Sequence, residues 1–69
     1  MTALGQRIKA ERKARQITMR ELCDRAGLRF TRLGYIESDM DNYGPSDNEL
    51  RRIAEALGMT VEQLRGGAS

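Results

Sequence analysis

The apolar positions along the chain recur at helical spacing and fall into five short segments. In the first, roughly residues 3–15, Leu4 and Ile8 lie one turn apart among charged residues, as in an amphipathic helix with one buried stripe. The third segment runs from about Phe30 to Glu37. We find neither the period-two alternation of a strand nor an internal repeat. The pattern therefore predicts an all-α fold of five helices.

Three of the predicted helices begin with a capping box. In this motif a Ser or Thr hydroxyl accepts a hydrogen bond from the backbone N–H three residues later, and the side chain at that later position accepts one in return. The matching segments are Thr18–Glu21, Ser46–Glu49 and Thr60–Gln63. Gly27 and Gly58 are predicted to end the second and fourth helices, because glycine adopts the left-handed conformation common there. The third helix has no such start, since Arg29 stands at the cap position.

Residues 18–37 have the features of two short helices that cross steeply. The inner faces of the two helices are predicted to carry small and aliphatic residues: Leu22, Cys23, Ala26, Leu33 and Ile36. Cys23 supplies the small residue that a close crossing needs, and Gly27 supplies a positive φ at the turn. This arrangement is typical of a helix-turn-helix.

With these features the chain resembles the Cro/C1-type, or xenobiotic-response-element-like, helix-turn-helix family of transcriptional regulators. The resemblance extends from Leu4 to Leu64 and includes the opening Leu4, Arg7, Ile8 and Arg12, then Pro45, Ser46, Leu50, Ile53, Leu57 and Gly58. It implies a compact, lambda-repressor-like domain over residues 1–65, followed by a flexible tail at 66–69. In such a domain the third helix enters the DNA major groove, and the second lies across the backbone with its N-terminus at a phosphate.

The amino-acid composition excludes several kinds of site. The chain of 69 residues has length for one domain, with one cysteine and no histidine. A disulfide within the chain is therefore excluded, and so is a zinc site of the usual ligands. The N-terminal residues carry charge early and contain no long apolar run. We expect a soluble cytoplasmic protein without cofactor, metal, small-molecule ligand or membrane partner.

Charge is unevenly distributed between the two halves. Residues 1–37 contain nine Arg and Lys against four Asp and Glu, whereas residues 38–69 contain three against six. This asymmetry is typical of a polyanion-binding face, although a solvated charged surface also accounts for it.

The residues expected to read bases lie at the start and on the outer face of the third predicted helix: Arg29, Phe30, Thr31, Gly34 and Tyr35. Arg29 suits guanine, and Thr31 suits a base edge or a thymine methyl. Phe30 suits a thymine methyl or a wedge between bases, with packing on the core or on the 38–45 loop as the structural alternative. Tyr35 suits either DNA contact or packing. Gly34 either admits close backbone approach or removes one contact.

The expected phosphate ligands are more widely spread, and comprise Arg7, Thr18, Met19, Arg20, Arg32, Asn42 and Tyr43. Met19 stands where the resembled family often has glutamine, which puts that contact in question. In the loop after Glu37, Asp39 and Asp41 replace the basic residues common in the family. The loop is therefore expected to turn from DNA, to use Asn42, Tyr43 and backbone amides, or to meet a protein partner.

Two further pairs of residues have expected roles, the first of them implied by the resemblance. Arg12 and Glu37 match positions that form a partly buried ion pair, which we interpret as structural. Val61 and Leu64 are apolar residues that suit either a homodimer interface or the core.

The predicted function is that of a DNA-binding transcriptional regulator, a repressor that binds a pseudo-palindromic operator as a dimer and acts on its own promoter. A protein-binding module, such as an antitoxin or anti-repressor, is the alternative. An enzyme is disfavoured, because Cys23 has no base beside it and the loop carboxylates lack a rigid platform.

Overall fold

The computed structural model describes residues 4–39 and 44–66, which contain five α-helices and no strand. In chain order the helices are Leu4–Ala14 (α1), Met19–Ala26 (α2), Phe30–Glu37 (α3), Asp47–Ala56 (α4) and Val61–Leu64 (α5). The predicted all-α, five-helix fold is confirmed. Of the expected tail, only Gly66 lies within the described residues.

The helices begin and end for the reasons seen in the sequence. All three capping boxes form, with Glu21, Glu49 and Gln63 as the returning side chains. Gly27 follows α2 with φ +70°, and Gly58 follows the end of α4 with φ +74°. Arg29 precedes α3 without a side-chain cap. Each of these predictions is confirmed.

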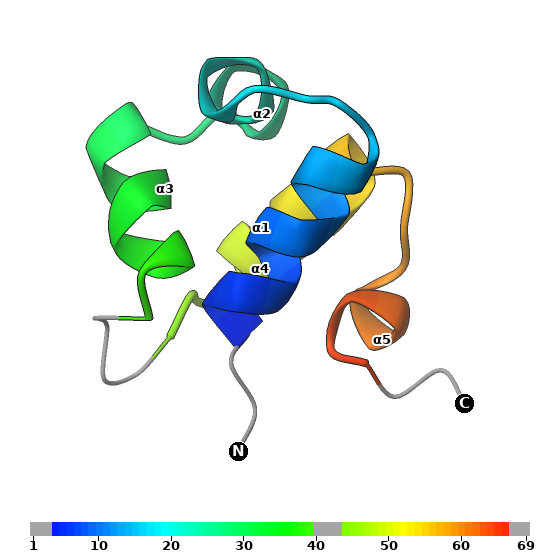
Figure 1. The fold of residues 1–69 in the computed structure, drawn as a ribbon. Helices are drawn as coiled ribbons and strands as arrows, with labels where there is room; N and C mark the ends of the chain where they lie inside the picture. The colour runs from blue at the N-terminus through cyan, green and yellow to red at the C-terminus, as the bar shows by residue number, and fades with distance from the viewer. Residues whose placement is uncertain (1–3, 40–43, 67–69) are drawn as a thin grey trace.

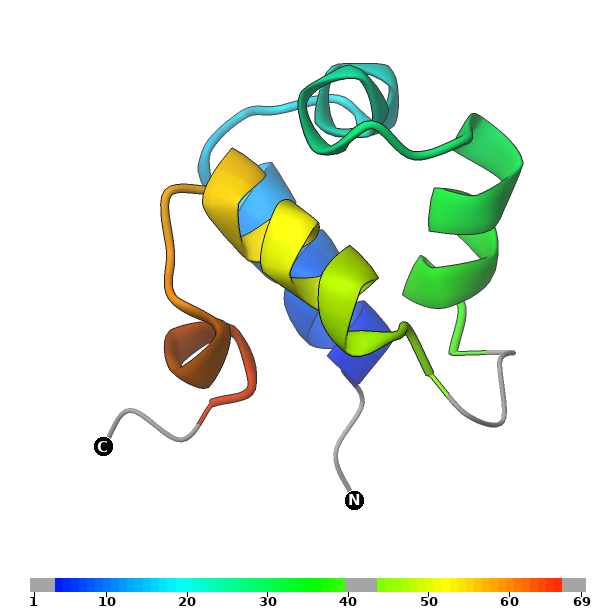
Figure 2. The same ribbon diagram turned by 180° about the vertical axis from the view of Figure 1, so that it is seen from behind.

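The α1 and α2 helices each pack against two other helices. The α2 helix packs against α3 and α4, and α1 packs against α3 and α5. Figure 1 shows α3 and α5 on opposite sides of the molecule, with α2 across the top and α1 and α4 between them. The reverse view in Figure 2 shows the same arrangement. The α3 helix therefore stands at one edge of the domain, supported by α1 and α2.

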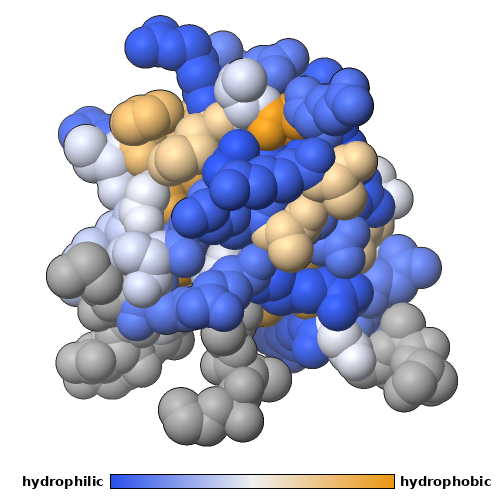
Figure 3. All heavy atoms as spheres, viewed as in Figure 1, coloured by the Kyte–Doolittle hydropathy of each residue, from blue (hydrophilic) through white to orange (hydrophobic). Residues whose placement is uncertain are grey.

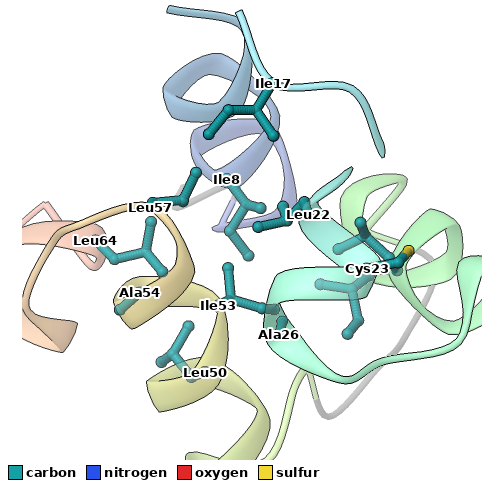
Figure 4. Packing of buried hydrophobic residues seen from close by; sticks show 12 residues of the cluster. Ile8, Ile17, Leu22, Cys23, Ala26, Leu50, Ile53, Ala54, Leu57 and Leu64 are labelled. Carbon is teal, nitrogen blue, oxygen red and sulfur yellow. The ribbon is translucent and has the colours of Figure 1, made fainter. Parts of the chain in front are cut away.

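Every helix contributes to one hydrophobic core (Figure 4). Its largest fully buried side chains are Ile8, Leu22, Leu33, Leu50, Ile53 and Leu64. Burial of each such side chain contributes about 1.5–3 kcal/mol. Of the two roles left open for Leu64, burial favours the core, because its side chain is 0% exposed. Val61 is partly buried and packs against the same core.

Gly5 marks the closest approach of α1 to the end of α3. A Cβ at this position would overlap the Ile36 carbonyl oxygen and would lie 2.9 Å from the Glu37 carbonyl carbon. The Gly5 backbone N–H donates to Asp39 Oδ1 at 2.8 Å. Asp39 thus satisfies one of the first free amides of α1, where a carboxylate also favours the helix dipole.

Candidate nucleic-acid interface

The turn between α2 and α3 is built from Cys23, Gly27 and Leu28. The Gly27 and Leu28 amides both donate to the Cys23 carbonyl oxygen, and the left-handed Gly27 redirects the chain. The Cys23 side chain is 5% exposed, so its small volume sits inside the crossing of the helices. Burial raises the pKa of the Cys23 thiol, which keeps it protonated and unreactive.

The outer face of α3 carries exposed side chains, and its inner face is anchored in the core. Leu33 and Ile36 are 0% and 2% exposed, whereas Phe30 is 54% exposed and Tyr35 is 45% exposed. Arg29 and Thr31 are also exposed. Phe30 and Tyr35 are the exposed large hydrophobic residues of the part of the chain that the structure describes. In Figure 3 an apolar patch lies over the junction of α2 and α3, bordered by hydrophilic residues.

The N-terminus of α2 presents free backbone donors beside this face. Within the capping box, the Glu21 amide donates to Thr18 Oγ1 at 3.1 Å, and the Thr18 amide donates to Glu21 Oε1 at 2.9 Å. The Met19 and Arg20 amides make no hydrogen bond to any other described residue. Two donors at the positive end of a helix dipole form a site suited to an anion.

A family model described as Helix-turn-helix matches residues 8–64, which is most of the chain. The chain belongs to the helix-turn-helix family, of the Cro/C1 type. The immunity repressor protein of Bacillus phage phi105 is 43% identical to it over 63 residues, which are 91% of this chain and 42% of that repressor. The chain thus spans less than half the length of this relative. The family is one of DNA-binding regulators rather than enzymes.

Within the helix-turn-helix, Met19 and Gly34 face each other. A methyl group added at Gly34 would lie 3.5 Å from Met19 Cε, at ordinary contact distance. The Met19 side chain is partly buried and packs against the core. Its thioether therefore fills the space beside Gly34 and does not replace the phosphate contact of glutamine. Only its backbone N–H remains a candidate ligand.

The predicted phosphate-binding arginines divide into engaged and available side chains. Arg7 pairs with Glu11 at 3.0 Å and donates to the Gln63 carbonyl oxygen at 3.2 Å. Arg32 makes two hydrogen bonds to the Glu49 carboxylate. Arg20 is exposed and has no hydrogen-bond or ion-pair partner in residues 4–39 and 44–66. Of these three, Arg20 is therefore the one poised for an external anion.

The Glu11 carboxylate lies between two arginines of α1. A hydrogen bond from Arg15 at 2.6 Å is the main reason that its pKa is lowered, and the charge of Arg7 acts in the same direction. Glu11 therefore pairs with both Arg7 and Arg15 of α1.

Arg12 and Glu37 lie together and are only 7% and 6% exposed. Arg12 Nε donates to Glu37 Oε2 at 2.9 Å, and Arg12 Nη2 donates to Glu37 Oε1 at 3.1 Å. A third bond, 3.0 Å long, runs from Arg12 Nη1 to the Ile17 carbonyl oxygen. The pair joins α1 to the last residue of α3, so it fixes the direction of that helix.

The loop after α3 starts with a left-handed residue that contacts α1. Asp39 has φ +59°, and its carboxylate accepts a hydrogen bond from the Gly5 amide while the residue remains exposed. Asp41, Asn42 and Tyr43 lie outside the described residues.

Two residues that contact α3 or its C-terminal end could not be predicted from the sequence. Gly5 is one of them, because a glycine inside a helix does not indicate a close contact with a distant segment of the chain. Glu49 was recognised as a cap, but its second role as partner of Arg32 depends on how α3 and α4 pack.

The described residues were also compared with the requirements of a pocket, a metal site and a membrane span. A groove of about 540 Å³ between α4 and α5 is lined by Asp47, Asn48, Arg51, Val61 and Arg65. Among the described residues, no cluster of His, Cys, Asp or Glu could hold a metal ion. No helix in that part of the chain is long and apolar enough to cross a membrane.

Proposed function

We propose that this chain is a repressor that binds double-stranded DNA sequence-specifically, with α3 in the major groove. The observation that carries the proposal is the outward display of Arg29, Phe30 and Thr31 at the start of a helix whose inner face is anchored in the core. The family supports DNA binding, and the phi105 relative bears the name of an immunity repressor. A protein with this role works where the DNA lies, in the bacterial cytoplasm.

The exposed side chains suggest how bases are read. Arg29 has no partner among the described residues, so its guanidinium is available for O6 and N7 of guanine. Phe30 offers an apolar surface to the C5-methyl group of thymine. Thymine contact is favoured over a wedge between bases, because such wedges belong to proteins that bind the minor groove. Tyr35 lies one turn after Thr31 on the same outer face.

Phosphate contacts would position this helix. The free amides of Met19 and Arg20 and the side chain of Arg20 lie at the start of α2, beside the outer face of α3. Thr18 supports this site through its capping bonds. Such contacts set orientation and carry no sequence information by themselves.

The proposed binding unit is a homodimer. The α3 helix has eight residues and is therefore about 12 Å long, which limits one copy to a few base pairs. A two-fold dimer doubles the reading surface on a pseudo-palindrome with half-sites about 34–36 Å apart. Because Leu64 is buried, Val61 in the α4–α5 groove is the better candidate for the dimer surface. An operator in its own promoter would make the protein autoregulatory.

Selection from a pool of random duplexes tests the proposal. The purified chain is expected to enrich a pseudo-palindromic site, and its affinity for that site should fall steeply with salt as phosphates are neutralised. Enrichment of no duplex, together with binding that does not depend on salt, would reject DNA recognition and favour the protein-binding alternative. The molar mass in solution with and without the selected duplex measures the dimer.

A further inference from the structure

Arg32 of α3 forms an ion pair with Glu49 of α4. Arg32 Nε donates to Glu49 Oε2 at 2.9 Å, and Arg32 Nη2 donates to Glu49 Oε1 at 2.8 Å. The two side chains are 32% and 22% exposed. A two-point contact of this kind fixes the plane of the guanidinium as well as its position. It also neutralises a cation that belongs to the reading helix and directly follows Thr31.

Glu49 is itself held in place by its own helix. Its Oε1 accepts a hydrogen bond from the Ser46 amide at 2.9 Å, and its amide donates to Ser46 Oγ at 3.1 Å. The carboxylate therefore serves α4 as a cap and Arg32 as a counter-ion at the same time. Hydrogen bonding from Arg32 is the main reason that the pKa of Glu49 falls from its ordinary value of 4.5 to about 2. Glu49 consequently stays charged at every pH at which the protein would bind DNA.

We propose that Glu49 is a positioning residue for DNA recognition, which holds Arg32 against α4 so that this arginine supports α3 and does not bind phosphate. The inference rests on the proposed function and concerns the same surface. Its consequence is a weaker attraction to the DNA backbone. Phosphate binding by an arginine adds affinity for any sequence, so withholding one cation lowers binding to every duplex to a similar degree and makes that binding less dependent on salt.

The chain offers a clean variant for the test. In α5 the same capping box uses Gln63 in place of glutamate, with bonds of 3.0 and 3.1 Å to Thr60. Glu49→Gln should therefore keep the cap of α4 while removing the charge that holds Arg32. Glu62→Gln changes the net charge equally, at an exposed residue of α5 with no bonded side-chain partner in the described ranges. It serves as the matched control.

The measurement is the slope of log affinity against log salt, for the selected duplex and for an unrelated one. Releasing one arginine to phosphate steepens this slope by about 0.9. Between 50 and 200 mM salt, the loss of affinity of Glu49→Gln should therefore exceed that of the wild type by about 3.5-fold. Glu62→Gln should retain the wild-type slope. Arg32→Gln should also retain it, and the double variant Glu49→Gln/Arg32→Gln should lose the gain.

Two outcomes would overturn the inference. A slope for Glu49→Gln equal to that of Glu62→Gln shows that the pair does not withhold a cation. A shallower slope for Arg32→Gln shows that Arg32 leaves Glu49 and binds phosphate in the complex. Circular dichroism of each variant checks folding. If Arg32→Gln is unfolded, the salt slopes of Glu49→Gln and Glu62→Gln are sufficient to test the proposal. In either case wild-type binding to the selected duplex stands, so this failure is distinct from failure of the proposed function.

Discussion

Removal of Arg12 from its buried pair should nearly unfold the domain. Glu37 is only 6% exposed in the wild-type structure, where its carboxylate accepts two hydrogen bonds from the Arg12 guanidinium. Arg12→Met removes both bonds and leaves that carboxylate buried without a partner. Breaking one side of a buried ion pair costs about 3–5 kcal/mol. The Ile17 carbonyl oxygen also loses its donor, which adds about 1 kcal/mol.

This loss is large compared with the stability of so small a domain. At about 0.05–0.15 kcal/mol per residue, a chain of 69 residues has a free energy of unfolding of about 3–10 kcal/mol. Urea unfolding followed by far-ultraviolet circular dichroism should therefore show Arg12→Met with most of that free energy gone. The double variant Arg12→Met/Glu37→Leu should recover most of the loss, because apolar residues of similar volume often replace a buried pair without penalty.

Two results would contradict a buried, charge-compensated Arg12–Glu37 pair. A loss below about 1 kcal/mol in Arg12→Met would mean that water screens the pair as it does a surface salt bridge. A double variant as unstable as the sum of the two single variants would mean that the pair contributes packing and not mainly compensated charge.

Four further perturbations have defined outcomes. Gly34→Ala should raise the free energy of unfolding by about 0.5–1 kcal/mol, since glycine weakens a helix interior and the added methyl fits. Gly5→Ala should lower it by about 1–3 kcal/mol through overlap with the backbone of α3. In acid, wild type should lose the contribution of the Glu49–Arg32 pair as pH falls from 4.5 towards 2, because a carboxyl with a lowered pKa stabilises only while it is ionised. Replacing thymine by deoxyuridine in the selected duplex should weaken wild-type binding and leave Phe30→Ala binding unchanged.

Each of these has a matching check. Urea unfolding measures both glycine variants, and equal stabilities for Gly5→Ala and wild type would refute the close approach. The acid effect is the difference in stability between wild type and Glu49→Gln, which should shrink as pH falls below 4.5 and be lost once pH has fallen through about 2. Equal sensitivity of wild type and Phe30→Ala to deoxyuridine would show that Phe30 does not contact the thymine methyl.

Local signals in the sequence predicted most of the fold. Capping boxes and helix-ending glycines act within four residues of each other, so Thr18, Ser46, Thr60 and Gly27 located helix ends without knowledge of the fold. The inward positions of α3 followed from its helical period, since Leu33 and Ile36 lie on one face.

Contacts between segments far apart in the chain could not be predicted from the sequence. Leu64 was apolar at helical spacing, which suits a core and an interface equally, and only packing against the other helices shows that it is buried. Arg32 resembled a phosphate ligand by its place on α3, but Glu49 reaches it from 17 residues away. Asp39 resembled a charge facing DNA, whereas its left-handed backbone turns the carboxylate towards Gly5. In all three cases the contacting residue belongs to another helix, and the sequence near Leu64, Arg32 or Asp39 does not indicate it.

If the start of α3 reads bases, replacing its three exposed side chains by alanine should abolish sequence selectivity. Arg29→Ala/Phe30→Ala/Thr31→Ala changes only exposed side chains, so its circular dichroism should match that of the wild type. The measured quantity is the ratio of affinities for the selected duplex and for a scrambled duplex of equal length and composition. We expect a ratio of about 10³ or more for the wild type and a ratio near one for the variant. A folded variant that keeps the wild-type ratio would contradict the account.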